Sequence, residues 1–364
     1  MNLLKYTFLL VLIFYCTIDA SDIEAKNDST ESDSFEYLLF PFVFFSPETN
    51  LAFGGGGIAY FKADANPLGK PSKITFSAYY TINQQYSVDI IPQIYLWREK
   101  VFLSVEFNYS KAIDKFFGIG NKTVDNGIED YEHLNLRFTT NISYKVYENL
   151  QYGIIYQFER RSIKDKLDNK LLDDVNLLGS GGGVSSGIGV STFWDTRDNI
   201  FFPSQGGLYE IKAVFSSKAL GSDFNYNNYE FNFRRYNTLT ENHYLAFQFY
   251  LNMVRGYPQF YALAALGGQN IMRGYYEGRY RDNNYFSIQT EYRVKLFWRF
   301  GAVVFLGIGD VADRVSNFKF KYLKPSYGAG LRYMMDEDDK LNLRIDLGFG
   351  KNGFGVYFSI EEAF

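Results

Sequence analysis

The sequence predicts an all-β protein: a transmembrane antiparallel β-barrel of about sixteen strands, with long extracellular loops and short periplasmic turns. Three observations predict this fold class. The 364 residues include 31 Tyr, 36 Phe and 32 Gly, an aromatic and glycine excess that favours strands over helices. Large apolar side chains alternate with polar ones in many segments of roughly ten residues. The chain also begins with a segment that is typical of secreted proteins.

Residues 1–20, MNLLKYTFLLVLIFYCTIDA, resemble a secretory signal peptide, because a lysine precedes an apolar core and a small residue closes the segment. The apolar run is short for a membrane span, so an uncleaved anchor is the weaker alternative. Cys16, the only cysteine, lies inside this run, and the mature chain therefore has no thiol. Residues 21–35 are polar and acidic without a period, which predicts a disordered leader. The barrel is expected over residues 36–364.

The strands are predicted from period-two alternation. In LNLRIDLGFG, residues 341–350, the large apolar side chains fall on one face, while Asn342, Arg344 and Asp346 fall on the other. A soluble sandwich also alternates, so the number and length of such segments decide the class. No stretch after residue 20 is apolar for about eighteen residues, so membrane residence requires closure into a barrel. The expected strands are 36–46, 50–63, 72–82, 85–97, 100–110, 131–143, 149–161, 183–194, 206–216, 225–238, 243–254, 283–294, 297–309, 325–334, 340–350 and 353–364.

The connections between these segments fall into two classes. After odd-numbered strands they are long and include 111–130, 162–182, 255–282 and 310–324. After even-numbered strands they are mostly short, such as REK and VYEN. Long loops on one side and tight turns on the other are typical of barrels in the bacterial outer membrane. The three tryptophans all fall at expected periplasmic strand ends, as an interfacial aromatic girdle requires.

Several other functional classes find little support. The net charge is −4 with both signs interspersed, so no basic field suggests a nucleic-acid partner. GFGKNG at 348–353 has the letters of a dinucleotide pattern, but too few residues follow it for a helix. His133 and His243 are far apart and near no motif. No constellation of carboxylates or serine elbow is present, so we predict no catalytic residues, no metal site and no cofactor.

The connection after the eleventh strand carries a more specific signal. GGQNIMRGYYEGRYRD, residues 267–282, resembles the signature of the sixth extracellular loop in the BamA-type superfamily of outer-membrane insertases and translocators, the bacterial surface antigen family. FWDTRDNIFFPSQGGLYE, residues 193–210, is similar to that family's turn between strands eight and nine. Phe364 resembles the terminal aromatic of a barrel-assembly signal, preceded at alternate positions by Ile360 and Phe358.

The resemblance implies that this loop folds back into the lumen, where Arg273 of the Arg273, Gly274, Tyr275 triplet meets inward carboxylates on strands twelve and thirteen. In FSIQTEYRV the apolar side chains share one face, so Glu291 points inward, where an arginine can pair with it. The matching position on strand thirteen lacks a carboxylate, so Asp310 nearby is the expected substitute. A solvated surface arginine is the alternative.

One departure from the family bears on function. Its assembly proteins carry periplasmic POTRA modules before the barrel, whereas here only residues 21–35 separate the predicted cleavage site from strand one. The resemblance therefore predicts a barrel without these receptor modules. Substrate capture would then use the short turns, the leader or a partner protein.

Three interpretations of function follow. The first is a BamA-like outer-membrane barrel that assists membrane protein insertion, protein export or lipid handling through a weak seam between the first and last strands. Pro41 removes a hydrogen-bond donor from strand one, and Gly353 and Gly355 weaken the closing strand. The alternative is a passive diffusion channel for small solutes. A structural anchor or an enzyme is the third. Expected partners are outer-membrane lipid, the barrel-assembly machinery for its own insertion, and periplasmic or outer-membrane proteins.

Overall fold

A computed structural model describes residues 36–46, 49–61, 71–123, 128–166, 172, 174, 177–337, 340–351 and 353–364. The predicted signal peptide and leader lie outside these residues. Within them, no helix is long and apolar enough to cross a membrane.

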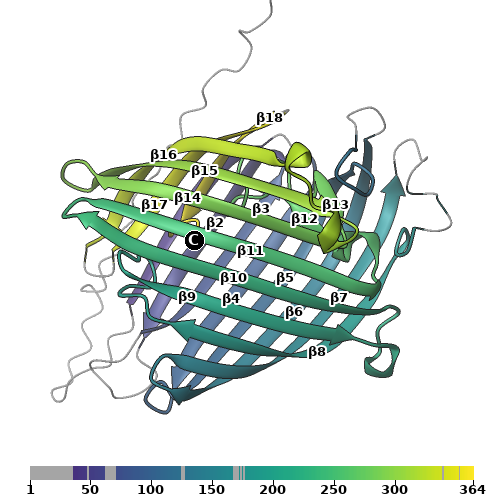
Figure 1. The fold of residues 1–364 in the computed structure, drawn as a ribbon, viewed down its shortest axis with the longest axis horizontal. Helices are drawn as coiled ribbons and strands as arrows, with labels where there is room; N and C mark the ends of the chain where they lie inside the picture. The colour runs from purple at the N-terminus through teal and green to yellow at the C-terminus, as the bar shows by residue number, and fades with distance from the viewer. Residues whose placement is uncertain are drawn as a thin grey trace, which may run out of the picture.

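Sixteen strands form one antiparallel sheet that curls into a barrel (Figure 1). Each strand pairs with the next along the chain, except that β11 pairs with β14, because β12 and β13 form a separate small hairpin. The prediction of an all-β barrel of about sixteen antiparallel strands is confirmed. The strands are β1 (Glu36–Ser46), β2 (Asn50–Phe61), β3 (Ser72–Thr81), β4 (Tyr86–Leu96), β5 (Val101–Phe116), β6 (Glu129–Tyr147), β7 (Leu150–Lys166), β8 (Gly182–Asp195), β9 (Gly206–Ser216), β10 (Asn225–Thr240), β11 (His243–Tyr257), β12 (Ala264–Leu266), β13 (Tyr280–Asp282), β14 (Asn284–Lys295), β15 (Phe300–Ala312), β16 (Lys324–Asp336), β17 (Leu341–Gly350) and β18 (Gly353–Ile360).

The barrel wall is polar inside and apolar outside. On β17, Arg344 and Asp346 are 0% exposed, whereas the intervening Ile345 and its neighbour Leu347 are 42% and 41% exposed. A soluble sandwich would bury the apolar side chains and expose the charged ones. The reversed pattern is expected where lipid surrounds the wall and polar groups face the lumen.

Strands β5, β6 and β7 are longer than the alternation predicted, with 16, 19 and 17 residues. A tilted strand crosses a membrane in about 9–11 residues, so these three project beyond it on the loop side. Their additional segments, such as 111–116, carry many charged residues. The alternation of large apolar and polar side chains did not predict these extensions, because they face no lipid and need no apolar side.

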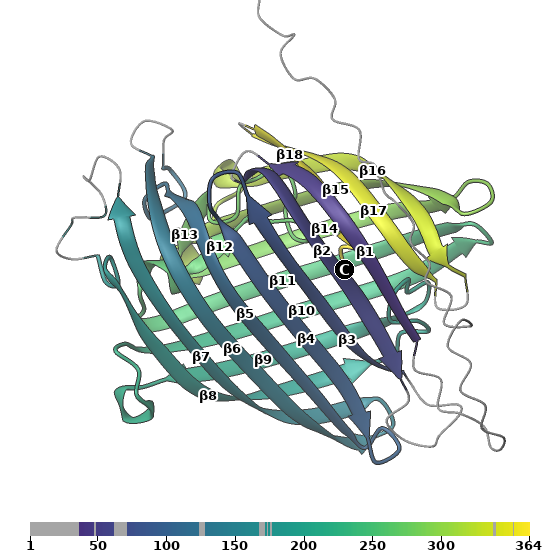
Figure 2. The same ribbon diagram turned by 180° about the vertical axis from the view of Figure 1, so that it is seen from behind.

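The described part of the sheet has two free edges. β1 and β18 lie at the ends of the strand order, and no ladder pairs them within the described residues (Figure 2). The seam between β1 and β18 is therefore the place where the wall lacks the hydrogen bonds that join all other neighbours.

A cluster of apolar side chains lies between loop six, the β11–β14 connection, and the extensions of β5 to β7. Phe260 begins a short 3-10 helix, η3 (Phe260–Ala262), and its ring packs 4.9 Å from that of Phe116 and 5.5 Å from that of Tyr131. Ile163 and Leu172 complete this buried cluster. Loop six thus spans the extracellular end from the β11–β14 wall to the β5–β7 wall.

The strand order sets which connections face outward, and cysteine labelling tests it. Removal of the predicted signal peptide leaves no thiol, so a single introduced cysteine labels alone. Lys321→Cys, in the exposed β15–β16 connection, should react with a membrane-impermeant maleimide on intact cells. Glu337→Cys, in the β16–β17 turn, should react only after the outer membrane is permeabilised. Labelling in the opposite sense would show that the barrel has the reverse orientation.

Candidate functional site

Loop six, residues 258–283, folds into the barrel. Its buried residues Leu266, Met272 and Tyr275 join one core with Val254 of β11 and Val311 of β15. The backbone N–H of Met272 donates to Oε1 of the inward residue Gln289 at 3.2 Å. Loop six is therefore held inside the barrel by apolar packing and by a hydrogen bond to the inward-facing wall.

Arg273 lies at the centre of the site. Its guanidinium forms ion pairs with Glu291 of β14 and Asp346 of β17, and all three side chains are fully buried. It also stacks 3.6 Å from the centroid of the Phe305 ring. A planar guanidinium can donate to two carboxylates at once while its face covers an aromatic ring. One loop residue thus joins strands β14, β15 and β17.

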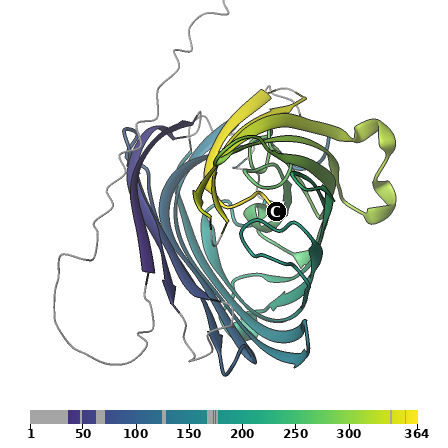
Figure 3. The same cartoon turned by 90° about the vertical axis from the view of Figure 1, so that its left-hand side faces the viewer.

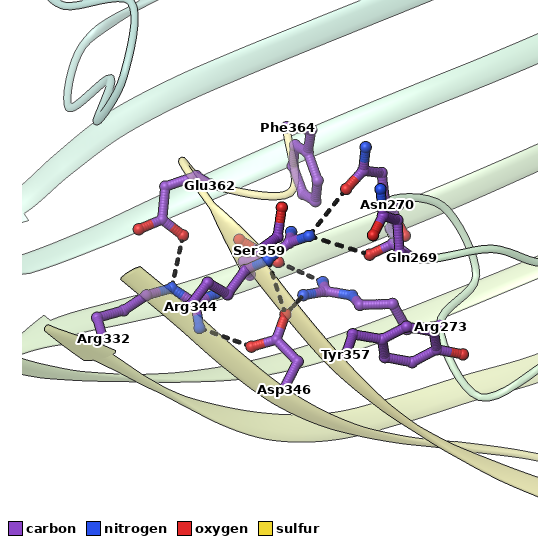
Figure 4. Close-up of polar contacts among 12 residues, drawn as sticks. Gln269, Asn270, Arg273, Arg332, Arg344, Asp346, Tyr357, Ser359, Glu362 and Phe364 are labelled. Carbon is purple, nitrogen blue, oxygen red and sulfur yellow. Dashed lines mark hydrogen bonds and ion pairs between the residues drawn. The ribbon is translucent and has the colours of Figure 1, made fainter. Parts of the chain in front are cut away.

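Further charged side chains surround these two carboxylates, and Figure 4 shows those near Asp346. Arg332 of β16 donates to Asp346 at 2.6 Å and to Glu362 at 2.8 Å. Arg293 of β14 contacts Glu291 at 2.8 Å. These buried charges are all paired, as burial away from water requires. The result is a continuous network from loop six to the residues that follow β18.

Gly274 lets the loop approach β17 closely. Its φ of +100° lies in the left-handed region, and a Cβ there would stand 2.3 Å from the backbone carbon of Phe349. On β17, Gly348 and Gly350 leave room for the loop, since a Cβ on either would lie within 2.9 Å of loop atoms. The Gly274 N–H donates to the Tyr357 hydroxyl at 2.8 Å. Only glycine satisfies both the backbone angle and the contact.

Tyr275 ties the same segment to the extracellular ends of two strands. Its hydroxyl donates to the Pro325 carbonyl at 2.7 Å and accepts the Lys351 N–H at 2.9 Å. Burial is the main cause that raises the pKa of Tyr275 to about 12. The phenol therefore stays protonated at neutral pH and keeps its donor role.

Comparison with known proteins decides the family. The Omp85 superfamily domain matches residues 66–360. The chain belongs to the Omp85 superfamily. The expected membership in the superfamily of BamA is thereby confirmed. No curated protein matches the sequence of this Omp85 chain.

Solved structures share the fold of this Omp85 barrel. BamA from Haemophilus ducreyi lacking POTRA domains 1–3 has a TM-score of 0.59 and 14% identity, covering 91% of this chain and 70% of that one. CdiB from Escherichia coli has a TM-score of 0.57 and 12% identity, and the match covers 92% of this chain and 63% of that one. CdiB from Acinetobacter baumannii has a TM-score of 0.55 and 13% identity, and the match covers 90% of this chain and 59% of that one. Omp85 proteins reside in the bacterial outer membrane as insertases or transporters, so this chain is an outer-membrane barrel in lipid and not an enzyme.

The structure corrects one expected partner of Arg273. Asp310 pairs instead with Lys324, whose Nζ lies 2.6 Å from its carboxylate. Arg273 extends over Phe305 and reaches Asp346, two strands beyond β15. The sequence did contain a signal, because Asp346 falls on the charged face of its alternating strand. Arg293, Arg332 and Glu362 complete the site and were also absent from the prediction.

The last residues of the Omp85 chain also differ from the expectation. The final strand ends at Ile360, where the prediction continued it to Phe364. Glu361 has a left-handed φ of +70°, which turns the chain out of the sheet. Phe364 is buried inside the barrel (Figure 3), and its main-chain oxygen accepts a hydrogen bond from Arg293 at 2.8 Å. The ion pair between Glu362 and Arg332 holds the residues after Ile360 inside the barrel.

The remaining predicted residues lie at the two edges of the sheet. Pro41 stands opposite Gly55 in the β1–β2 ladder. Gly353 and Gly355 stand opposite glycines of β17, and Phe358 stands opposite Ile345. These positions belong to the strands that flank the seam.

Proposed function

We propose that this Omp85 barrel assists the insertion or export of proteins, or the handling of lipids, by opening at the seam between β1 and β18. The observation that carries the proposal is the seam itself. A strand edge that no ladder joins to its neighbour within the described residues can pair with an incoming strand, and its separation breaks no ladder. Pro41, which cannot donate, further weakens pairing on β1. The barrel-assembly machinery for its own insertion, and a periplasmic or outer-membrane protein that delivers clients, are the partners that fit this role.

The contents of the lumen argue for this function over passive diffusion. Loop six is anchored across the interior by Arg273, and its η3 segment packs under the extracellular end. Phe364 and the residues before it occupy the interior from the other end. A diffusion channel needs a continuous water-filled path, and these segments lie inside the lumen where that path would run.

Conductance in planar bilayers separates the two functions. The purified barrel should give small, unsteady currents, because loop six and the C-terminal segment lie inside the lumen. A general porin of known conductance provides the reference in the same bilayers. Large, steady openings of the unmodified protein would support the diffusion channel instead.

Cross-linking of the seam tests the proposed opening directly. Leu39→Cys on β1 and Val356→Cys on β18 both face outward, and a bifunctional maleimide would tether them. We expect the tethered barrel, reconstituted in liposomes, to lose any acceleration of the folding of a small client barrel. The matched control tethers Ile211→Cys to Phe231→Cys, which are already paired between β9 and β10. Equal client folding by the two tethered proteins would contradict opening at the seam.

A further inference from the structure

The turn between β8 and β9, residues 196–205, is longer than the other periplasmic turns near it and enters the barrel. Asn199 organises its centre, because its side-chain oxygen accepts the backbone N–H groups of Phe201 and Phe202 at 2.8 Å each. Asp198 accepts the N–H groups of the last two residues before β9, at 2.8 and 3.0 Å. These bonds present two neighbouring phenylalanine rings on a preorganised turn.

Phe201 belongs to a cluster that includes strands from both sides of the seam. It is 2% exposed and forms a buried cluster with Ile58 of β2 and Leu341 of β17. The Tyr60 ring of β2 meets it edge-on at 6.0 Å. Partly buried neighbours from both sides of the seam pack against this cluster: Leu38 of β1, Met335 of β16 and Ile360 of β18. One side chain from the opposite wall thus lies between the first strands and the last ones.

An ion pair crosses the seam beside this ring. Lys73 of β3 contacts Glu361, the residue after β18, with 2.5 Å between Nζ and Oε1. The same Nζ lies 4.8 Å from the centroid of Phe201. An ammonium over an aromatic face gains from the ring quadrupole, so the ring and the ion pair support one another. Both contacts occur at the periplasmic end of β1 and β18, and among the residues that the structure describes no ladder joins these two strands.

We infer that Phe201 is a positioning residue for the seam: it holds the periplasmic ends of β1 and β18 at a fixed separation from inside the barrel. Burial of a large aromatic ring stabilises the joined arrangement without strand-to-strand hydrogen bonds. The contact can be broken by moving a turn, whereas a complete ladder would have to be separated bond by bond. The inference extends the proposed function, but the separation of the strands can be measured without any client.

The test measures the distance between spin labels at Leu39→Cys and Val356→Cys, on the thiol-free mature chain in lipid, by pulsed electron resonance. Phe201→Ala should broaden the distance distribution and shift it to longer distances. Phe201→Leu keeps an apolar side chain of similar reach and should restore the parent distribution. Phe202→Ala is the matched control, because that ring is equally buried in the same turn but packs edge-on, at 5.2 Å, against Tyr244 of β11.

Only variants that migrate as folded, heat-modifiable barrels are compared. If Phe201→Ala does not fold, Lys73→Gln serves in its place, since it removes the ion pair and leaves the ring; it should broaden the distribution to a smaller extent. An unchanged distribution in the variant measured would overturn the inference, and so would equal broadening by Phe202→Ala. The two proposals can also fail separately. If Phe201→Ala broadens the distance distribution as expected but the seam tether does not change client folding, only the proposed function is overturned.

Discussion

Arg273→Ala should release loop six from the lumen while the barrel remains folded. The substitution leaves Glu291 and Asp346 without the guanidinium that bridges them, and removal of one partner from a buried ion pair costs about 3–5 kcal/mol. Part of this cost is offset, because Arg293 and Arg332 still contact these carboxylates. The ladders that join the strands are untouched, so the protein should still reach the outer membrane and migrate as a heat-modifiable barrel.

Limited proteolysis measures the release. Trypsin can cut loop six at Arg279 and Arg281, which are buried in the folded loop. A loss of about 3 kcal/mol corresponds to cleavage roughly 100-fold faster when the loop opens and closes rapidly. Conductance should rise in the same variant. Arg314→Ala, in an exposed loop, is the control and should change neither quantity.

A double-mutant cycle assigns the effect to the network. Glu291→Gln should also loosen the loop, and Arg273→Ala combined with Glu291→Gln should be little worse than Arg273→Ala alone. Fully additive effects would mean that the two residues act independently. Unchanged trypsin resistance in both single variants would show that the ion pair does not hold the loop.

Gly274→Ala should displace the same loop by a different cause. A non-glycine residue at a φ of +100° is strained by about 1–3 kcal/mol, and its Cβ would overlap the backbone of Phe349 at 2.3 Å. Backbone atoms in a ladder cannot move aside as a flexible side chain can. Arg273 would then be lifted from its two carboxylates. We expect trypsin sensitivity close to that of Arg273→Ala, with the barrel still folded.

Gly268→Ala distinguishes the effect of backbone strain from the effect of a steric clash with β17. Gly268 has a φ of +130°, but the nearest atom to its added Cβ is the Glu277 carboxylate at 3.9 Å. This control carries a similar backbone strain without the clash, so it should loosen the loop far less. Equal sensitivity of the two variants would mean that the contact between Gly274 and β17 contributes nothing.

The sequence alone determined the wall of this barrel. Period-two alternation located all sixteen strands of the sheet, because lipid on one side and a polar lumen on the other select opposite side chains at alternate positions. It also placed Glu291 on the inward face. It underestimated β5 to β7, since their extracellular extensions meet no lipid and need no apolar face.

The partners across the lumen were decided by the tertiary structure. Alternation shows that Asp346 points inward, but how far Arg273 reaches depends on the height and angle at which loop six crosses Phe305. The departure of the chain from the sheet after Ile360 likewise depends on Arg332 and Arg293, which lie on other strands. The alternation along a strand depends only on which side chains face lipid and which face the lumen, so it can be read from each segment by itself. A pairing across the barrel depends on the curvature of the whole sheet, which no single segment encodes.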